Sequence, residues 1–388
     1  MNINLFMEKN ECCGCTACAN ICPKNAIKMV EDEEGFLYPK IDQDLCVKCG
    51  LCMQVCAFQK GYSIEQRLSK IEVYASKNKS DEIRMSSSSG GMFWSFATSI
   101  LNQKGIVYGV IFDKNFHAMH SRADSIEKLK KMQGSKYSQS DLGETFKNVK
   151  EDLQLGKKVL FTGTPCQVAG LNKFLGNINR ENLILIDIVC YGTPSPKLFG
   201  EYIKFLEQKK HSKVKEYYHK SKKNGWRHSR EEVVYENKED DYTSRLSQTW
   251  KRIFYTNLAL RPSCNNCKYT NANRPSDITI GDFWGIDKYD PNFSDDKGVS
   301  VILLNTTKGK QAFNDISNDI FYKARNIEEA INENPRLKRP TETAKEKREK
   351  FWNDYKIKGF KYITKKYGGY NIVGKLKNFV KNSLKNLK

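Results

Sequence analysis

Residues 12–23 of the chain read CCGCTACANICP, and residues 46–57 read CVKCGLCMQVCA. With Cys13 left out of the first stretch, two residues separate the first cysteine of each stretch from the second and the second from the third, and three residues precede the fourth. Proline follows the first run at Pro23, whereas Ala57 follows the second. Two copies of one spacing in a short segment indicate that the front of the chain folds around its thiols.

This repeated spacing is typical of bacterial ferredoxins with two [4Fe-4S] clusters. Three thiolates on a tight loop bind one cluster, and the fourth cysteine binds the other. We therefore predict a 2x[4Fe-4S] ferredoxin-like domain over residues 1–62. Paired zinc sites are the alternative, although zinc sites rarely use this spacing. Cys13 is given no role, and the predicted ligand sets are Cys12, Cys15, Cys18 and Cys56 for one cluster, and Cys46, Cys49, Cys52 and Cys22 for the other.

Composition places the chain among globular proteins. Its 388 residues suit two or three domains, and 39% of them are hydrophobic. No run approaches the roughly 20 apolar residues of a membrane span, and the first ten residues do not resemble a signal peptide. We therefore expect a cytoplasmic protein, in which 13 cysteines indicate metal binding or redox work rather than disulfides.

The positive charge is concentrated at the C-terminal end. Residues 336–388 hold 17 Lys and Arg against 4 Asp and Glu, which leaves about +7 of the net charge of +20 for the rest of the chain. Aromatic residues alternate with charges in KFWNDYKIKGFKYITKKY (350–367), so we predict a basic helical tail over residues 336–388. The tail is expected to contact an acidic partner or a membrane surface peripherally, and no nucleic-acid partner is expected.

After a polar linker near residues 58–70, short apolar runs alternate with helical patterns. The strand-like runs are GIVYGVIF, KKVLFTG, NLILIDIVC, DITIGDF and VSVILLN. Such alternation predicts an α/β domain with a mostly parallel sheet over residues 71–335. Ligands of such sheets bind at the carboxyl ends of the strands.

The segment SSSSGGMF at residues 86–93 is one candidate ligand site. Its free backbone N–H groups, its hydroxyls and the following helix favour an anion such as a cofactor phosphate. A serine N-cap followed by a tight turn explains the same pattern.

Four cysteines remain outside the ferredoxin runs and Cys13. Cys166 in FTGTPCQVAG lies at a predicted helix N-terminus, where the pKa of a thiol falls, and Cys190 in DIVCYG ends the next predicted strand. If those strands are parallel, both sulfurs lie at one edge of the sheet. Together with Cys264 and Cys267 of SCNNCKYT they could bind a third [4Fe-4S] cluster or a tetrahedral zinc ion, or remain buried thiols.

Several motifs, in their order along the chain, resemble the family named for the beta subunit of coenzyme F420-reducing hydrogenase and dehydrogenase. They are SSGGMF, GSKY, FTGTPCQVAGL, IVCYGTPS, CNNCKY and DITIGDFWGI, and the resemblance runs from about residue 71 to 355. It implies an FAD-binding domain behind the ferredoxin domain, with a third [4Fe-4S] cluster beside the flavin. It also implies a catalytic role for Lys136 and cofactor contacts by Ser88, Ser89, Gly90, Gly91, Gly134, Ser135, Lys136 and Tyr137.

The resemblance implies an iron–sulfur, flavin-dependent oxidoreductase. FAD would exchange a hydride with a small cofactor or substrate, coenzyme F420 or another, and single electrons with the clusters. The expected partners are a small hydride donor or acceptor and a redox protein or soluble electron carrier. Two alternatives stay open: an electron-transfer subunit without catalysis of its own, and a reductase serving cell-envelope polysaccharide synthesis.

Overall fold

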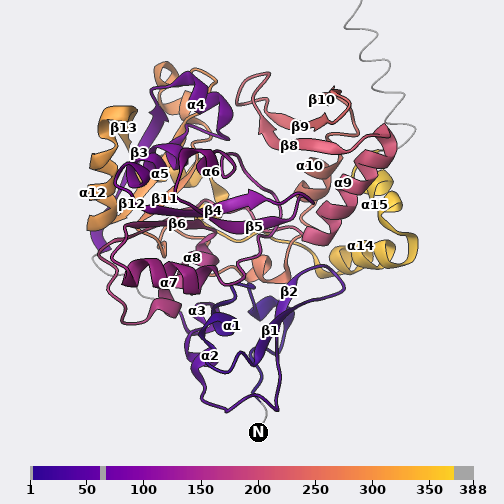
Figure 1. Ribbon diagram of the computed structural model, residues 1–388. Helices are drawn as coiled ribbons and strands as arrows, with labels where there is room; N and C mark the ends of the chain where they lie inside the picture. The colour runs from indigo at the N-terminus through magenta and orange to yellow at the C-terminus, as the bar shows by residue number, and fades with distance from the viewer. Residues whose placement is uncertain (1–2, 62–66, 371–388) are drawn as a thin grey trace, which may run out of the picture.

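The computed structural model describes residues 3–61 and 67–370. The front segment lies below a sheet-containing body (Figure 1). Its two short strands pair antiparallel, with Ile27 opposite Ile41, and its helices are single turns beside the cysteine loops. In chain order its elements are η1 (Lys9–Glu11), α1 (Ala17–Ile21), β1 (Ile27–Glu31), β2 (Leu37–Ile41), α2 (Leu51–Gln54) and α3 (Ala57–Lys60).

An eight-stranded sheet organises the body within the described residues. Its strand order is β13-β3-β12-β11-β7-β6-β4-β5. Each apolar run that the sequence marked as strand-like lies in this sheet. The strands are β3 (Arg67–Asn78), β4 (Ile106–Phe112), β5 (Ala118–Ala123), β6 (Val159–Gly163), β7 (Leu183–Ile188), β11 (Ile278–Asp282), β12 (Ser300–Thr306) and β13 (Ile320–Arg325).

The sheet is mixed, so the prediction of a mostly parallel sheet was wrong. Its central strands β4, β6, β7 and β11 run parallel, whereas the strands on both sides pair antiparallel. An apolar run of strand length carries no signal for direction. Parallel strands need long crossovers, but β5 returns directly from β4 through a short turn.

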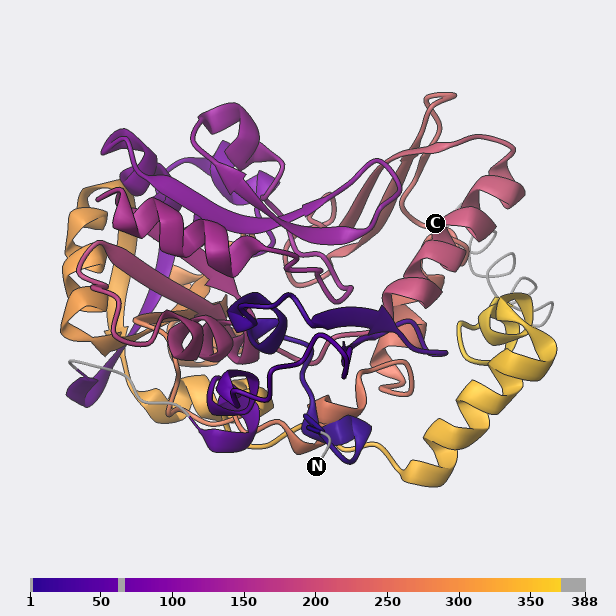
Figure 2. The same ribbon diagram turned by 60° about the horizontal axis from the view of Figure 1, so that its bottom comes forward.

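Helices cover both faces of the sheet, and alternate residues of each strand enter different cores. One face packs against α7 (Thr145–Gln154) and α8 (Pro165–Leu175), and buried residues of the front segment, among them Cys15 and Phe58, complete this core. The other face packs against α5 (Met92–Asn102), α6 (Ile126–Lys130) and α12 (Thr307–Asp315). The front segment therefore shares a core with the body (Figure 2).

A second, three-stranded sheet has the order β10-β9-β8 and lies to one side of the body (Figure 1). Its core includes helices from distant parts of the chain, with Phe351 and Ile363 of the predicted tail fully buried. The rest of that tail, residues 371–388, lies outside the described residues. These elements are β8 (Val214–Ser221), β9 (Arg230–Tyr235), β10 (Asp240–Asp241), α9 (Pro196–Lys210), α10 (Thr249–Tyr255), α14 (Lys345–Lys358) and α15 (Phe360–Lys366).

The remaining elements are short. They are α4 (Asp81–Ser86), η2 (Pro262–Asn266), α11 (Ile286–Tyr289), η3 (Pro291–Phe293), η4 (Ser317–Asp319), α13 (Ile327–Glu333) and η5 (Pro335–Leu337). Among the described helices, none combines the length and the apolar character that a membrane crossing requires.

Candidate redox sites

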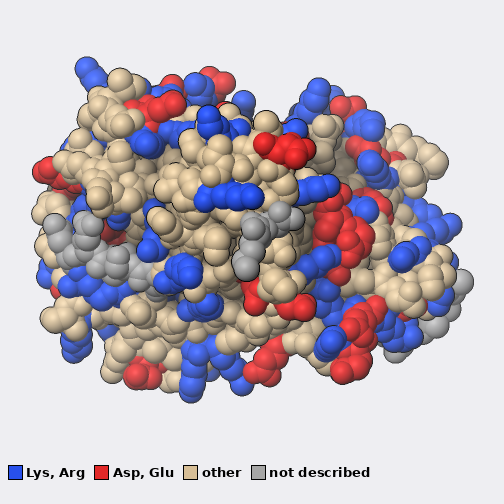
Figure 3. Space-filling model, turned by 90° about the horizontal axis from the view of Figure 1, so that it is seen from below, with Lys and Arg blue, Asp and Glu red and all other residues tan. Residues whose placement is uncertain are grey.

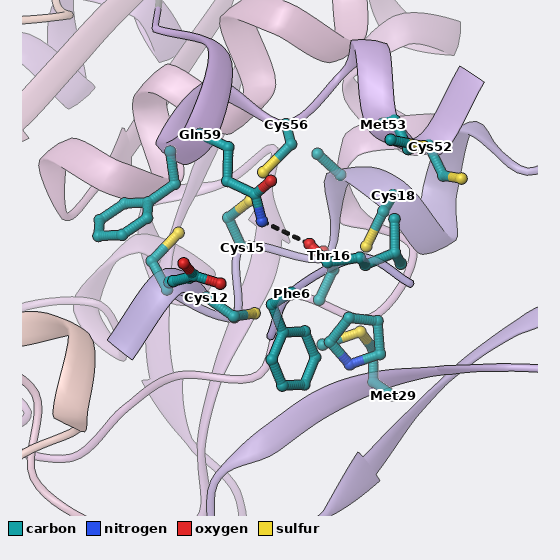
Figure 4. Close-up of a pocket in the computed structure, with 17 residues that line it drawn as sticks. Phe6, Cys12, Cys15, Thr16, Cys18, Met29, Cys52, Met53, Cys56 and Gln59 are labelled. Carbon is teal, nitrogen blue, oxygen red and sulfur yellow. Dashed lines mark hydrogen bonds between the residues drawn. The ribbon is translucent and has the colours of Figure 1, made fainter. Parts of the chain in front are cut away.

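The two predicted cysteine sets of the front segment each line a separate cavity. Figure 4 shows the first cavity, with the sulfurs of one set around it. Gly14 and Gly50, with φ of +69° and +76°, allow the left-handed turns that these loops contain. The first cavity is lined by Cys12, Cys15, Cys18 and Cys56 together with Cys13, the second is lined by Cys22, Cys46 and Cys49, and Cys52 borders both cavities.

The two sets differ in their access to solvent. Cys15 is buried against the body, whereas Cys49 is exposed at the far end of the segment. Leu45 and Val47, beside the second set, are 53% and 58% exposed. Seen from this side of the molecule, Lys and Arg side chains are spread over the surface, among uncharged areas (Figure 3). The second set is therefore the one that an external protein can approach.

The chemistry of the first set fits a metal cluster. Burial raises the pKa of the Cys12, Cys18 and Cys56 thiols. A buried thiol ionises readily when a metal replaces its proton, because the metal compensates the thiolate charge. The hydrogen bond with Cys13 lowers the pKa of the fourth thiol, Cys15. The four thiols around one cavity form a ligand set of the type that [4Fe-4S] clusters use.

Strands β6 and β7 bring together the first half of the third set. They pair parallel, with Gly163 opposite Asp187, so Cys166 and Cys190 leave the sheet at the same edge. This confirms the expected parallel arrangement of the two strands. Thr164 begins α8 with a capping box to Gln167, which fixes Cys166 in the first turn of the helix.

The SCNNCKYT segment supplies the second half. Cys264 lies in η2 and Cys267 ends it. The charges of Cys264, Cys166 and Cys267 all act on the buried Cys190 thiol and raise its pKa, after burial itself. The Thr193 amide donates to the Cys264 sulfur over 3.4 Å. The four predicted cysteines thus face one another in the interior.

A buried ion pair holds both halves of the third set. Arg274 donates to the Oδ1 atom of Asp187 over 3.0 Å, and both side chains are almost fully buried. The same guanidinium donates to the Tyr269 carbonyl over 2.6 Å and to the Ile188 carbonyl over 2.8 Å. It therefore connects the chain just after Cys267 with the end of β7.

A zinc ion and a [4Fe-4S] cluster at the third set would require different distances between the four sulfurs. Zinc–sulfur bonds of about 2.3 Å in a tetrahedron bring the four sulfurs to about 3.8 Å of one another. In the part of the chain that the structure describes, no three His, Cys, Asp or Glu side chains form a group that could hold one metal ion, and this is true of the two ferredoxin sets as well as of the third set. A cubane cluster spaces its ligands more widely, since each thiolate binds a different iron atom.

A large cavity of about 550 Å³ lies at the carboxyl ends of the parallel strands. Its size is in the range of cofactor sites. Ser88 accepts hydrogen bonds from the amide and hydroxyl of Ser135 over 2.8 and 2.9 Å, which joins the two stretches predicted to contact flavin. The predicted residues that line this cavity are Ser88, Ser89, Gly91, Gly134, Ser135, Lys136 and Tyr137.

Gly90 lies behind the cavity wall. Its amide donates to Ser300 Oγ over 2.9 Å, and a Cβ atom here would lie 2.5 Å from the Ser76 carbonyl oxygen. Gly90 therefore allows the loop to pack against the backbones of β3 and β12. Gly91, with φ of +87°, makes the turn into α5.

Lys136 lies in the cavity wall with its amine enclosed. The amine donates to the carbonyls of Gln133, Lys131 and Gly134 over 2.7, 3.1 and 3.1 Å. Burial lowers the pKa of Lys136 to about 7. A proton held this loosely can change the charge of the wall near neutral pH.

Other residues of the cavity were missed by the sequence reasoning. The second sheet contributes His219 and Lys220, and α10 contributes Lys251. Trp284 stacks on Trp226 with ring centroids 4.9 Å apart. The basic, aromatic-containing run at residues 219–230 was the available signal, but its distance from the quoted motifs concealed its place in the site.

The cysteine sets and the cavity adjoin one another. Cys190 belongs to the third set and also lines the cavity. On the other side, the Cys13 thiol hydrogen-bonds to Cys15 of the first set and to Cys166 of the third. Cys13, to which the sequence assigned no role, thus lies between two of the sets.

These arrangements agree with comparisons against known proteins. Residues 11–60 match the family described as a 4Fe-4S dicluster domain. Residues 156–330 match the family described as the C terminus of the beta subunit of coenzyme F420 hydrogenase/dehydrogenase. The cysteine sets and these matches define an iron–sulfur electron-transfer protein. More particularly, residues 156–330 are similar to the C-terminal part of coenzyme F420 hydrogenase/dehydrogenase beta subunits, and a dicluster ferredoxin domain precedes them in the chain.

Individual relatives are distant. The chain is 21% identical over 193 residues to the F component of the F(420)H(2) dehydrogenase of Methanosarcina mazei, which covers 47% of the chain and 54% of that protein. It is 30% identical over 56 residues to "Uncharacterized ferredoxin MJ0722" of Methanocaldococcus jannaschii, which covers 14% of the chain and 71% of that protein. A chain of the F420-reducing [NiFe] hydrogenase complex from Methanosarcina barkeri superposes with a TM-score of 0.45 at 16% identity, over 69% of this chain and 90% of that one.

Proposed function

We propose that the protein is an iron–sulfur flavoprotein that transfers electrons between a redox partner and a small hydride donor or acceptor. Three [4Fe-4S] clusters and one FAD would serve this path. One observation carries the proposal: Cys190 is shared by the third cysteine set and the large cavity, so a cluster and a bound cofactor would adjoin.

FAD suits this junction because a flavin accepts two electrons as a hydride and releases them singly. The chain supplies the residues to hold it. The Ser88–Ser135 contact joins two stretches of the cavity wall, and the positive charge of Lys136 in the same wall would favour an anionic cofactor. Lys222 donates to the Lys297 carbonyl over 2.8 Å and also to the Ser89 carbonyl. It therefore stabilises the Ser88–Gly91 loop.

The hydride partner is proposed from the relatives. Coenzyme F420 appears in the names of the matched family and of the Methanosarcina mazei protein. It is therefore the first candidate, and a different small oxidant or reductant is the second. Turnover of F420 by protein that contains flavin would distinguish the two.

A relay role within a larger assembly is the competing proposal. The exposed apolar side chains beside the second cysteine set would suit docking of a redox protein. If the chain bound clusters but no flavin, it would pass electrons between other proteins and perform no hydride chemistry.

The test is quantitative analysis of protein purified without oxygen. We expect about 12 iron atoms per chain, four for each of three cysteine sets, with one FAD and no zinc. About eight irons with one zinc would reject the third cluster. A full iron content without flavin, even after added FAD, would reject the flavoprotein proposal in favour of the relay.

A further inference from the structure

Arg261 is a fully buried arginine at the junction between the front segment and the body. It is 1% exposed and directly precedes η2, which carries Cys264. Its Nε atom donates to the Cys12 carbonyl over 2.8 Å, and Nη2 donates to the Leu37 carbonyl over 3.0 Å. Nη1 donates to Gln139 Oε1 over 3.0 Å.

The charge of Arg261 has no carboxylate partner among its hydrogen-bond acceptors in the described chain. These acceptors are uncharged oxygens, apart from the Cys12 sulfur at 3.7 Å from Nη2. The guanidinium lies over the ring of Tyr38 at 4.1 Å. A cation in the interior is costly unless an anion lies close, and the thiolates of a cluster at Cys12 would supply that anion.

The same residue also contacts the third cysteine set. Its carbonyl accepts from the Cys264 amide over 2.9 Å, while its side chain reaches the sulfur of Cys12. The Cys13 thiol links the two sets a short distance away. Arg261 therefore connects the first set and the third through one residue.

We propose that Arg261 is a positioning residue that raises the reduction potential of the site formed by Cys12, Cys15, Cys18 and Cys56, and so sets the direction of electron transfer at this junction. This inference rests on the proposed iron–sulfur function. One electron leaves one cysteine-bound site and enters the other, and no proton or bond changes. Reduction makes the acceptor one charge more negative, and a fixed cation favours that form.

Gln139 keeps the guanidinium in this orientation. Its Oε1 atom accepts from Arg261, and its Nε2 atom donates to the Cys13 carbonyl over 3.0 Å. Both the oxygen and the nitrogen of the Gln139 amide are therefore hydrogen-bonded in the region between the two cysteine sets. Gln139→Leu should leave the charge in place and lower the potential less than loss of the arginine does.

The experiment is a redox titration of the full chain, purified without oxygen and followed by electron paramagnetic resonance. In Arg261→Met the iron content should stay unchanged while one cluster potential falls by about 59 mV or more, a tenfold change for one electron. Arg261→Lys, which keeps the charge, should recover most of the potential. If Arg261→Met loses iron, Arg261→Gln replaces it, because its amide can still donate to Cys12.

Arg348→Met is the matched control. Arg348 also joins the body to the front segment, but its Nη1 donates to Glu34 Oε1 over 2.8 Å, so its charge is already compensated. Its replacement together with Glu34→Gln removes a compensated pair without changing the net charge, and should leave all potentials unchanged. Unchanged potentials in Arg261→Met with full iron, or equal shifts in Arg261→Lys and Arg261→Met, would overturn the inference. Absence of iron from the unaltered protein would instead refute the proposed function.

Discussion

Asp187→Asn should destabilise the third cysteine set from a distance. Asp187 is fully buried and accepts from Arg274, which in turn holds the Tyr269 and Ile188 carbonyls. Removing one partner of a buried ion pair leaves the other charge uncompensated and costs about 3–5 kcal/mol. We therefore expect loss of iron from the third site at urea concentrations that leave the ferredoxin clusters intact.

A double-mutant cycle separates the free-energy cost of losing the ion pair from the cost of altered packing. Arg274→Met alone should cost as much, because Asp187 then loses its cation and the two carbonyls lose a donor. In the double variant Asp187→Asn with Arg274→Met no charge remains buried, so about 2–3 kcal/mol should be regained relative to the sum of the single changes. Urea unfolding, with iron followed by electron paramagnetic resonance, measures each corner of the cycle.

The control removes an ion pair of similar length at the surface. Glu144, whose side chain is 74% exposed, accepts from Lys147 over 2.9 Å. Glu144→Gln should cost no more than about 1 kcal/mol, since exposed pairs contribute little. Additive losses in the cycle, or equal losses for Glu144→Gln and Asp187→Asn, would refute the reasoning from the buried pair.

Three further changes test the sites. Cys267→Ser should lose about four of about 12 irons and slow electron transfer to flavin, as iron analysis and stopped-flow absorbance would show; full iron would exclude Cys267 as a ligand. Because burial lowers the pKa of Lys136 to about 7, flavin affinity measured by fluorescence should fall as pH rises through 7, whereas Lys136→Arg should bind equally across that range; a flat profile in the unaltered protein would contradict the role. In Gly170→Ala the new Cβ would lie 2.8 Å from the Cys15 sulfur, so iron at the first set should decrease. Gly200→Ala, with open space around it, is the control and should be neutral or stabilising by up to about 1 kcal/mol. Equal iron content in the two variants would show that the contact with Cys15 is tolerated.

Local patterns in the sequence predicted secondary structure well where apolar residues form a continuous run or where a capping residue marks the start of a helix. The apolar runs of β4, β6 and β7 and the helix after Thr164 appear as expected. Strand direction was not predictable from such runs, so β12 was predicted as a strand without its antiparallel direction, and the antiparallel strand β5 was not predicted. Direction depends on connections and on partners distant in the chain.

The residues of the candidate site also fall into those that the sequence predicted and those that it did not. Cysteine spacing is a local signal, and it led to the sets that the structure brings together. Arg261 gave no such signal, because its position depends on packing between segments that are distant in the chain. Gly90 matched the loop pattern but lies behind the cavity, where close backbone packing requires a residue without a side chain.

The contacts between the ferredoxin segment and the body limit which other ferredoxin domains could replace this segment. Asn20 donates to the Gly143 carbonyl over 2.8 Å, and a Cβ at Gly35 would lie 2.2 Å from the Cβ of Lys197. Such contacts fix the segment on the body, so it is held in one position. A foreign ferredoxin in its place would carry cysteine ligands but would lack the side chains that hold this segment against the body.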